Sequence, residues 1–252
     1  MVIIMSPEAT EDEIVAVENR LKDSPADLHL KRTDGEILTI IAAIGDTSAV
    51  DGMRLESLSG VDRVVPISQP YKLASNEIRH HEPSVYNIGG VKIGGNHFCL
   101  IAGPCTVEDH ETALRDAMIC AEGGASMLRA GIFKPRTSPF AFQGPGTEGF
   151  KTLKAMKEMT GLPVVSELTS NKYAEELAEV VDVIQIGARN MQNYKLLEIV
   201  GKLGKPVLLK RGLASTLVES LQAADDILKD RGAVILCERG IRTFETSTRF
   251  TF

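Results

Sequence analysis

The 252-residue sequence lacks the signals of membrane-spanning, secreted and nucleic-acid-binding proteins. It contains no run of 18 apolar residues, so no membrane-spanning helix is predicted. The amino terminus, MVIIMSPEATEDE, has no basic segment and turns acidic at once, unlike a secretory signal. The formal net charge of −6 argues against nonspecific nucleic-acid binding as the main activity. These absences predict a cytoplasmic protein without a membrane or nucleic-acid partner.

Two further patterns are missing. The four cysteines include no CxxC pair, so neither a disulfide framework nor a structural zinc site is indicated. GxxxxGK, the glycine pattern of one class of phosphate-binding turn, does not occur, and GxGxxG occurs once, at residues 144–149.

The first 68 residues show the element order β-α-β-β-α-β. VIIM is a short apolar strand, and Thr10 with Glu13 has the spacing of a capping box at the start of a helix. Two strands then meet at a turn at Asp34-Gly35, and AVDGMRLESLSG and VDRVVPIS predict a weaker helix and a last strand. This order predicts a ferredoxin-like α+β domain over residues 1–68. The polar, proline-containing stretch 69–84 predicts a linker.

Residues 85–252 are expected to form the second domain. A hairpin is predicted in VYNIGGVKIGGN, and apolar strands then alternate with amphipathic helices. The strands expected are HFCLIAG, SMLRAG, PVVSEL, VDVIQIG, PVLLKRG and AVILCERG, and the helices expected span 108–122, 147–159, 171–180, 192–203 and 216–230. Such alternation indicates a parallel α/β sheet, either a barrel or a doubly wound sheet.

Charged residues at the strand ends favour the barrel. All strands but the first end at or just before a charged residue: Arg129, Glu167, Arg189, Lys210 with Arg211, and Glu238 with Arg239. In a (β/α)8 TIM barrel these carboxyl ends meet on the catalytic face. We therefore expect a TIM barrel with about six of its βα units present, and thus truncated at its carboxyl-terminal end.

Six cations are expected at or near this face: Arg129, Lys134, Arg136, Arg189, Lys210 and Arg239. Each one alone could be solvated or paired with Glu167 or Glu238. Six together indicate a ligand with several negative charges, such as two phosphorylated molecules, because like charges repel unless an anion joins them. Cys105, at the end of the first strand, could be a small buried side chain or could bind a divalent transition metal.

Lys134 and Arg136 lie in GIFKPRTSPFAFQG, residues 131–144. Prolines on both sides disfavour a helix or a central strand, so a rigid loop is predicted. A rigid loop would hold two positive charges at a fixed separation.

The motifs IAGPCTVE, LRAGIFKPRTSPFAFQG, IQIGARNMQN, PVLLKRG and ILCERGIRTFE resemble those of the 3-deoxy-D-arabino-heptulosonate 7-phosphate (DAHP) synthases that carry an amino-terminal ferredoxin-like domain. The resemblance covers the whole chain, and KPRTSPFAFQG is its most specific motif. It implies condensation of phosphoenolpyruvate with erythrose 4-phosphate, the first step of the shikimate pathway. It also implies a homo-oligomer, a tetramer, with feedback inhibition by tyrosine or phenylalanine.

The resemblance assigns roles to individual residues. Phosphoenolpyruvate would be held by Arg129, Lys134, Arg189, Lys210 and Arg239, with the backbone near Ala188. Arg136, Thr137 and Ser138 would contact erythrose 4-phosphate. Lys134 would act as the catalytic proton donor, and Cys105 would bind a divalent metal ion such as Mn, Fe, Co or Zn.

Two alternatives stay open at this point. The related 3-deoxy-D-manno-octulosonate 8-phosphate synthases share the barrel and the metal cysteine but have KANR where this chain has KPR. The family's other metal ligands, a histidine, a glutamate and an aspartate, lie on the last two barrel strands, whereas this sequence reaches RTFETSTRFTF after the sixth strand. The chain could therefore be a noncatalytic subunit that binds phosphorylated metabolites or regulates another chain, and we expect it to be inactive when expressed alone.

Overall fold

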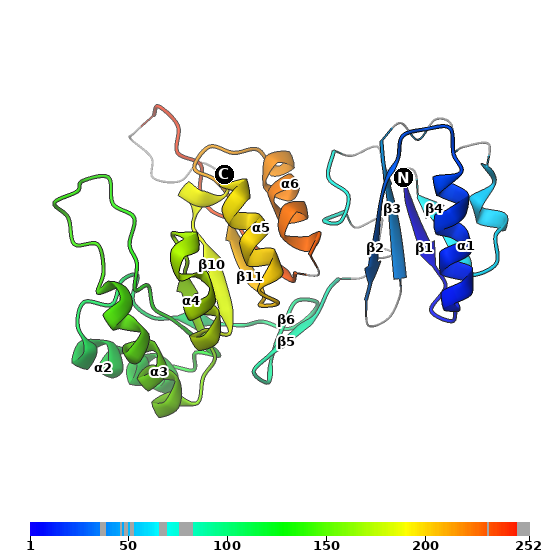
Figure 1. The fold of residues 1–252 in the computed structure, drawn as a ribbon. Helices are drawn as coiled ribbons and strands as arrows, with labels where there is room; N and C mark the ends of the chain where they lie inside the picture. The colour runs from blue at the N-terminus through cyan, green and yellow to red at the C-terminus, as the bar shows by residue number, and fades with distance from the viewer. Residues whose placement is uncertain are drawn as a thin grey trace. The chain divides into compact units, whose positions relative to one another are not determined.

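The structure is a computed structural model that describes residues 1–35, 39–45, 47, 50, 53–65, 70–75, 83–230 and 232–245. It divides into two compact units, Met1–Glu82 and Pro83–Phe252 (Figure 1). No helix among the described residues is both long enough and apolar enough to cross a bilayer.

The first unit is an antiparallel sheet covered by a helix. Its elements are β1 (Val2–Met5), α1 (Glu11–Lys22), β2 (His29–Asp34), β3 (Thr39–Ile44), the short 3-10 helix η3 (Leu55–Ser57) and β4 (Val61–Val65). The strand order β2-β3-β1-β4, with all described pairs antiparallel, confirms the ferredoxin-like fold.

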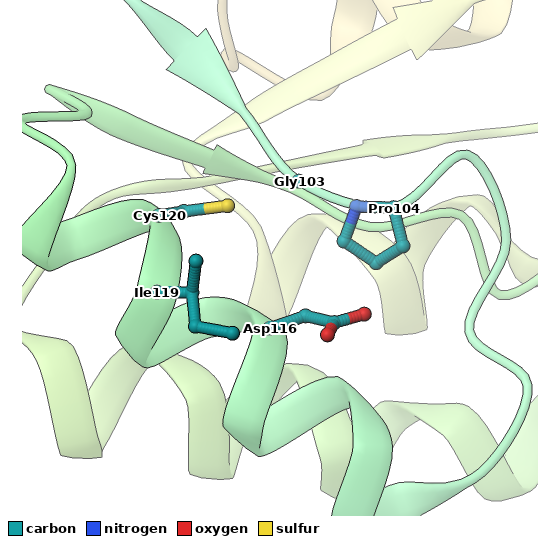
Figure 2. A pocket seen from close by; sticks show the side chains of 5 residues that line it. All are labelled: Gly103, Pro104, Asp116, Ile119 and Cys120. Atoms are coloured by element: carbon teal, nitrogen blue, oxygen red, sulfur yellow. The ribbon is translucent and has the colours of Figure 1, made fainter.

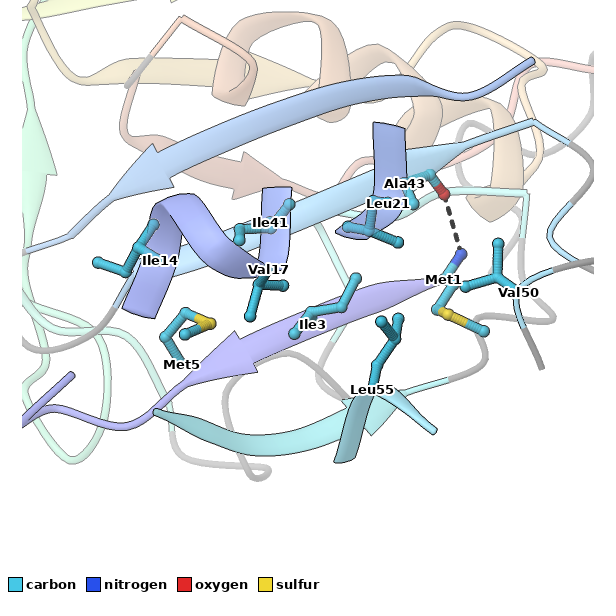
Figure 3. Close-up of a cluster of buried hydrophobic side chains, with 10 residues drawn as sticks. All are labelled: Met1, Ile3, Met5, Ile14, Val17, Leu21, Ile41, Ala43, Val50 and Leu55. Atoms are coloured by element: carbon cyan, nitrogen blue, oxygen red, sulfur yellow. Dashed lines mark hydrogen bonds between the residues drawn. The ribbon is translucent and has the colours of Figure 1, made fainter. Parts of the chain in front are cut away.

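Helix α1 forms as its sequence predicts. Thr10 and Glu13 make the capping box, in which the Thr10 N–H donates to Glu13 Oε2 at 2.8 Å and the Glu13 N–H donates to Thr10 Oγ1 at 3.4 Å. The apolar face of α1 then packs on the sheet through Ile14, Val17 and Leu21 (Figure 3). The helix is therefore fixed at its start by hydrogen bonds and along its length by burial.

The second predicted helix of this unit is wrong in its described part. From Met53 to Ser59 the chain has no α-helix and only 3-10 conformation, at Met53 and in η3. Arg54, directly before it, has a left-handed φ of 49°, which a right-handed helix cannot contain. Residues 49, 51 and 52 of the prediction lie outside the described residues.

The second unit begins with a hairpin, β5 (Tyr86–Ile88) and β6 (Val91–Ile93), which turns at Gly89-Gly90 as predicted. Six strands follow: β7 (Ile101–Ala102), β8 (Met127–Arg129), β9 (Val164–Glu167), β10 (Val183–Ile186), β11 (Val207–Lys210) and β12 (Val234–Cys237). The connecting helices are α2 (His110–Glu122), α3 (Gly149–Thr160), α4 (Ala174–Val180), α5 (Tyr194–Lys202) and α6 (Leu217–Leu228), with short 3-10 helices η5 (Gly146–Glu148), η6 (Asn171–Tyr173) and η7 (Ala188–Asn190).

The six strands are parallel and pair in chain order, from β7 at one edge of the sheet to β12 at the other. Regular βα alternation with sequential pairing is the arrangement of a TIM barrel, and it confirms the predicted fold class. The predicted strand HFCLIAG is much shorter than expected. Only Ile101 and Ala102 pair with β8, and Phe98, which precedes the paired residues, is 87% exposed.

Alternate residues of the strands build two layers on the sheet face opposite the helices. Met127, Val165, Val183 and Leu208 form an apolar layer with Ile88 of the hairpin. Two positions further along the same four strands come four polar side chains: Arg129, Glu167, Gln185 and Lys210. We call these four residues the polar layer. It lies at the carboxyl ends of the strands, where barrel enzymes place their active sites.

Candidate active site

The polar layer is connected by hydrogen bonds across three strands. Arg129 Nε donates to Gln185 Oε1 at 3.1 Å, and Gln185 Nε2 donates to Glu167 Oε2 at 3.0 Å. The sheet register explains the second bond, because Gln185 on β10 pairs with Glu167 on β9. Glu167 and Gln185 are both buried, at 7% and 1% exposed. The layer is therefore a fixed part of the sheet rather than a set of solvated side chains.

Lys210 is the fourth residue of the polar layer, and nearby groups offset only part of the free-energy cost of its positive charge. Burial lowers the pKa of Lys210, and the positive charge of Arg129 lowers it further, while Cys237 and Glu167 act in the opposite direction. The net direction is downward, so the protonated lysine is held at a cost. An anion bound beside it would remove that cost.

Cys105 follows β7 and is approached by two cations. Lys134 Nζ donates to Cys105 Sγ at 2.5 Å, and Arg129 Nη2 lies 3.9 Å from the same sulfur. Burial raises the pKa of the Cys105 thiol, but the hydrogen bonds and charges of Lys134 and Arg129 outweigh it, and the net pKa is lowered. The structure thus brings together Arg129, Lys134 and Lys210, three of the six predicted cations.

The base of the loop containing Lys134 is held by backbone hydrogen bonds and by aromatic contacts. The Lys134 N–H donates to the Gln143 carbonyl at 2.8 Å, and the Gly146 N–H donates to the Ile132 carbonyl at 2.9 Å. Phe133 stacks on Tyr173 with ring centroids 4.7 Å apart. The loop contains no helix or strand, as its prolines predict, and its base has the fixed position that an active-site lysine needs.

The outer part of the loop is exposed and makes its contacts within itself. Arg136 Nε donates to the Phe142 carbonyl at 3.2 Å, and Ser138 Oγ accepts from the Phe140 N–H at 3.3 Å. Thr137 is exposed as well. Contact of Arg136, Thr137 and Ser138 with a second substrate therefore stays a prediction.

The remaining predicted residues are placed at strand ends with local contacts. Ala188 and Arg189 form η7 directly after β10, and Arg189 is exposed. Arg239 Nε donates to the Gly240 carbonyl at 3.1 Å. Arg211, by contrast, has a carboxylate partner, since its Nε lies 2.7 Å from Glu238 Oε1. Arg211, which is not one of the six predicted cations, is thus already paired with a carboxylate.

Gln185 is a site residue that sequence reasoning missed, and Glu167 was considered only as a counterion. A signal was present, because Gln185 is a polar residue within the apolar strand VDVIQIG. It stands two positions after Val183, just as Arg129 stands two positions after Met127. Because side chains alternate between the two faces of a strand, the four residues of the polar layer lie on the same sheet face as the apolar layer.

The described residues offer an incomplete metal site. Cys105 is a suitable thiolate ligand for a divalent transition metal. No group of three or more His, Cys, Asp or Glu side chains suited to a metal ion occurs among the described residues. Because transition-metal sites take about four ligands, these residues do not by themselves fit a resident metal.

A small hollow near Cys105 does not suit a phosphorylated ligand. It lies between α2 and the end of β7 and is lined by Gly103, Pro104, Asp116, Ile119 and Cys120 (Figure 2). Its one charged side chain, Asp116, is acidic and would repel phosphate. The cations of the polar layer are the better candidate for anion binding.

The fold and this cation site define a class of protein, the barrel proteins that bind anionic ligands at the carboxyl ends of their strands. The chain belongs to the DAHP synthase family. Residues 53–252 match the DAHP synthetase I family, and residues 1–69 match the DAHP synthase ferredoxin-like domain. Members of the family generally use a divalent metal, with phosphoenolpyruvate and erythrose 4-phosphate as substrates.

Individual relatives agree with this assignment. The phospho-2-dehydro-3-deoxyheptonate aldolase of Thermotoga maritima is 42% identical over 252 residues, which is 100% of this chain and 74% of that protein. The crystal structure of that protein superposes on this chain with a TM-score of 0.70 at 41% sequence identity. The match covers 99% of this chain and 72% of the chain in the crystal structure. A 2-dehydro-3-deoxyphosphooctonate aldolase of Citrifermentans bemidjiense is 39% identical over 162 residues, covering 61% of this chain and 59% of that protein.

Proposed function

We propose that the protein condenses phosphoenolpyruvate with erythrose 4-phosphate to give DAHP and phosphate. The observation that supports this most is the cluster of Arg129, Lys134 and Lys210 in a chain of this family. Arg129 and Lys134 contact the Cys105 thiol, and Lys210 is close enough to feel the charges of both cations and of the buried Glu167. Such a group of cations suits a small ligand with carboxylate and phosphate groups.

In this proposal Arg129, Lys134 and Lys210 bind phosphoenolpyruvate. Arg189 and Arg239 add positive charge from the ends of their strands, and the backbone near Ala188 adds hydrogen bonds. Arg136, Thr137 and Ser138, on the exposed part of the loop, contact the phosphate of erythrose 4-phosphate. The fixed base of the loop then sets the distance between the two substrates.

Lys134 is the proton donor in the proposed reaction. The methylene carbon of phosphoenolpyruvate forms a bond to the aldehyde carbon, and the aldehyde oxygen becomes an alkoxide. Protonated Lys134 gives its proton to this oxygen. Overall, water adds at the phosphate-bearing carbon and inorganic phosphate leaves, which balances the reaction.

The test is a discontinuous assay of the purified full chain with phosphoenolpyruvate and divalent metal. Erythrose 4-phosphate is supplied in one arm and arabinose 5-phosphate in the other. Formation of a seven-carbon product with release of phosphate would support the proposal, and would show that the inactivity expected of this chain alone is wrong. Faster turnover of arabinose 5-phosphate would assign the octulosonate activity instead, which the phosphooctonate relatives make the main alternative. If neither aldehyde reacted while phosphoenolpyruvate still bound, the noncatalytic metabolite-binding interpretation would replace both.

We further propose that the first unit makes the enzyme sensitive to tyrosine or phenylalanine and that the chain forms a homo-oligomer, a tetramer. Support comes from the match of residues 1–69 to the ferredoxin-like domain of this family, and from the position of every proposed substrate-binding residue in the second unit. Inhibition by either amino acid at millimolar concentration is expected, together with a tetrameric mass by light scattering. Full activity in the presence of both amino acids would contradict the regulatory role.

A further inference from the structure

The hydrogen bonds of the polar layer form a series that leads from Glu167 through Gln185 to Arg129. Gln185 lies in the middle, and both ends of its amide are used, at 3.1 Å and 3.0 Å. Its side chain is buried between neighbouring strands and has no access to a substrate in solution. A direct chemical role for Gln185 is therefore excluded, but an effect through Arg129 is not.

The chemistry of the two partners fixes the orientation of the amide. Arg129 Nε is a donor only, so it requires the Gln185 oxygen. An ionised Glu167 is an acceptor only, so it requires the Gln185 nitrogen. The two demands agree, and a flipped amide would lose both hydrogen bonds inside a buried layer, where unpaired polar groups are costly.

The orientation of Gln185 in turn directs Arg129. With Nε bonded to Gln185, the terminal nitrogens of the guanidinium point elsewhere, and Nη2 lies 3.9 Å from Cys105 Sγ. The planar guanidinium has a rigid fork geometry, so fixing Nε also fixes where Nη1 and Nη2 can bind an anion.

We propose that Gln185 is a positioning residue, which Glu167 orients and which holds Arg129 ready to bind the anionic substrate. The identity of that substrate as phosphoenolpyruvate rests on the proposed function. The simpler alternative is that Gln185 only satisfies its neighbours and stabilises the sheet. The two interpretations predict different results when Arg129 is changed, because a positioning residue affects substrate binding only through Arg129.

A double-mutant cycle measures this difference. Gln185→Met keeps the length of the side chain and removes both hydrogen bonds. Arg129→Lys keeps the charge and removes the Nε donor that Gln185 binds. The readout is the Kd for phosphoenolpyruvate by calorimetry on the full chain. Leu208→Met is the matched control, because Leu208 pairs with Gln185 on the neighbouring strand and is buried in the apolar layer.

Gln185→Met is expected to weaken phosphoenolpyruvate binding by at least about tenfold, the effect of losing one hydrogen bond to a charged group. In the Arg129→Lys background the same substitution should change the Kd by no more than about twofold, and Leu208→Met should do the same in the wild type. An equal loss in both backgrounds, or no loss in either, would overturn the inference.

Glu167→Gln provides a second variant if Gln185→Met does not fold. An amide at position 167 can both donate and accept, so Gln185 is no longer held in one orientation. Phosphoenolpyruvate binding should weaken, although removal of a negative charge would strengthen anion binding by electrostatics alone. Tighter binding by Glu167→Gln would contradict the proposal.

Failure of the proposed function would be visible separately. If the wild type binds phosphoenolpyruvate but forms no DAHP, the proposed function fails, and the cycle still decides the role of Gln185. If the wild type binds no phosphoenolpyruvate, the crystal structure of Gln185→Met decides it. Arg129 should then have left its position beside Cys105, and an unmoved guanidinium would overturn the inference.

Discussion

Arg32 in the first unit and Arg129 in the second are both part of a sheet, yet their partners differ in kind. Arg32 has two carboxylates, with Nη1 2.5 Å from Glu11 Oε1 and Nε 2.6 Å from Asp34 Oδ1. Arg129 has an amide and a thiol, and no carboxylate among the described residues lies within ion-pair distance of it. Arg32 is therefore neutralised by the fold, whereas the charge of Arg129 has no carboxylate counterion among the described residues, which agrees with its proposed role in anion binding.

The pKa shifts show the same contrast. The hydrogen bonds that Arg32 donates to Glu11 and Asp34 raise the pKa of Arg32. Burial and the neighbouring Arg129 lower the pKa of Lys210. The carboxylate partners of Arg32 favour its protonated form. Lys210 lacks such a partner, so its protonated form costs free energy in the folded state. Unpaired charge at a strand end is thus a better guide to the site than charge alone.

Lys210→Met should produce the largest change and should separate binding from stability. Loss of a partly buried charged partner is expected to weaken phosphoenolpyruvate binding toward the upper part of a range of about 10- to 150-fold. The melting temperature should rise at neutral pH, because the lowered pKa means that protonated Lys210 destabilises the fold. This gain should fade as the pH rises from the lowered pKa to the ordinary value of 10.5, where the unfolded chain also loses the proton.

Lys157→Met is the control for this prediction. Lys157 Nζ lies 2.8 Å from Asp182 Oδ1, and Asp182 also accepts the Val164 N–H at 2.9 Å. Its loss should lower the melting temperature and leave the Kd unchanged. If Lys210→Met also lowered the melting temperature, paired and unpaired lysines would not differ as described.

Arg189→Ala should have a smaller effect on binding than Lys210→Met, of about tenfold, because Arg189 is exposed and its charge is better screened. Arg211→Ala is the comparison, since Arg211 pairs with Glu238 and donates to the Ser215 carbonyl at 3.2 Å. Arg211→Ala should lower the melting temperature and should affect the Kd for phosphoenolpyruvate less. An unchanged Kd for Arg189→Ala by calorimetry would remove Arg189 from the site.

Glu198→Gln on α5 should have the smallest effect. Hydrogen bonds from Lys202 and Lys195 lower the pKa of Glu198 to about 2. A lowered carboxyl pKa stabilises the fold above the ordinary value of 4.5, and the contribution is lost as the pH falls toward 2. Because these groups are on the surface, the melting temperature at pH 7 should change by no more than about 2 °C, and salt should reduce the change further. A larger, salt-insensitive change would mean that exposed pairs matter more here than expected.

Strand periodicity predicted the fold well, since both sheets follow from short apolar runs and turn residues. The carboxyl-end rule also placed Arg129 and Lys210 correctly. It could not separate Lys210 from Arg211, which are adjacent in sequence but face different partners, Arg211 being paired with Glu238. That distinction depends on contacts between strands far apart in the chain.

Other parts of the fold and of the candidate site could not be predicted from local sequence patterns. The contact of Lys134 with Cys105 joins a loop to the segment that follows β7, which no spacing encodes. The apolar content of HFCLIAG predicted a longer strand than the two residues of β7 that pair with β8. The amide of Gln185 was predictable in position from alternation, but its orientation required both partners to be known.

The most direct test of the central claim is a calorimetric titration of phosphoenolpyruvate into Arg129→Ala and Arg32→Ala, each beside the wild type and each with its melting temperature. We predict that Arg129→Ala weakens binding by at least about tenfold and also lowers the melting temperature, because the buried Gln185 Oε1 loses its donor. Arg32→Ala should bind phosphoenolpyruvate as the wild type does and melt a few degrees lower. Equal affinities for the two variants would contradict the claim that unpaired charge, rather than charge as such, marks the binding site.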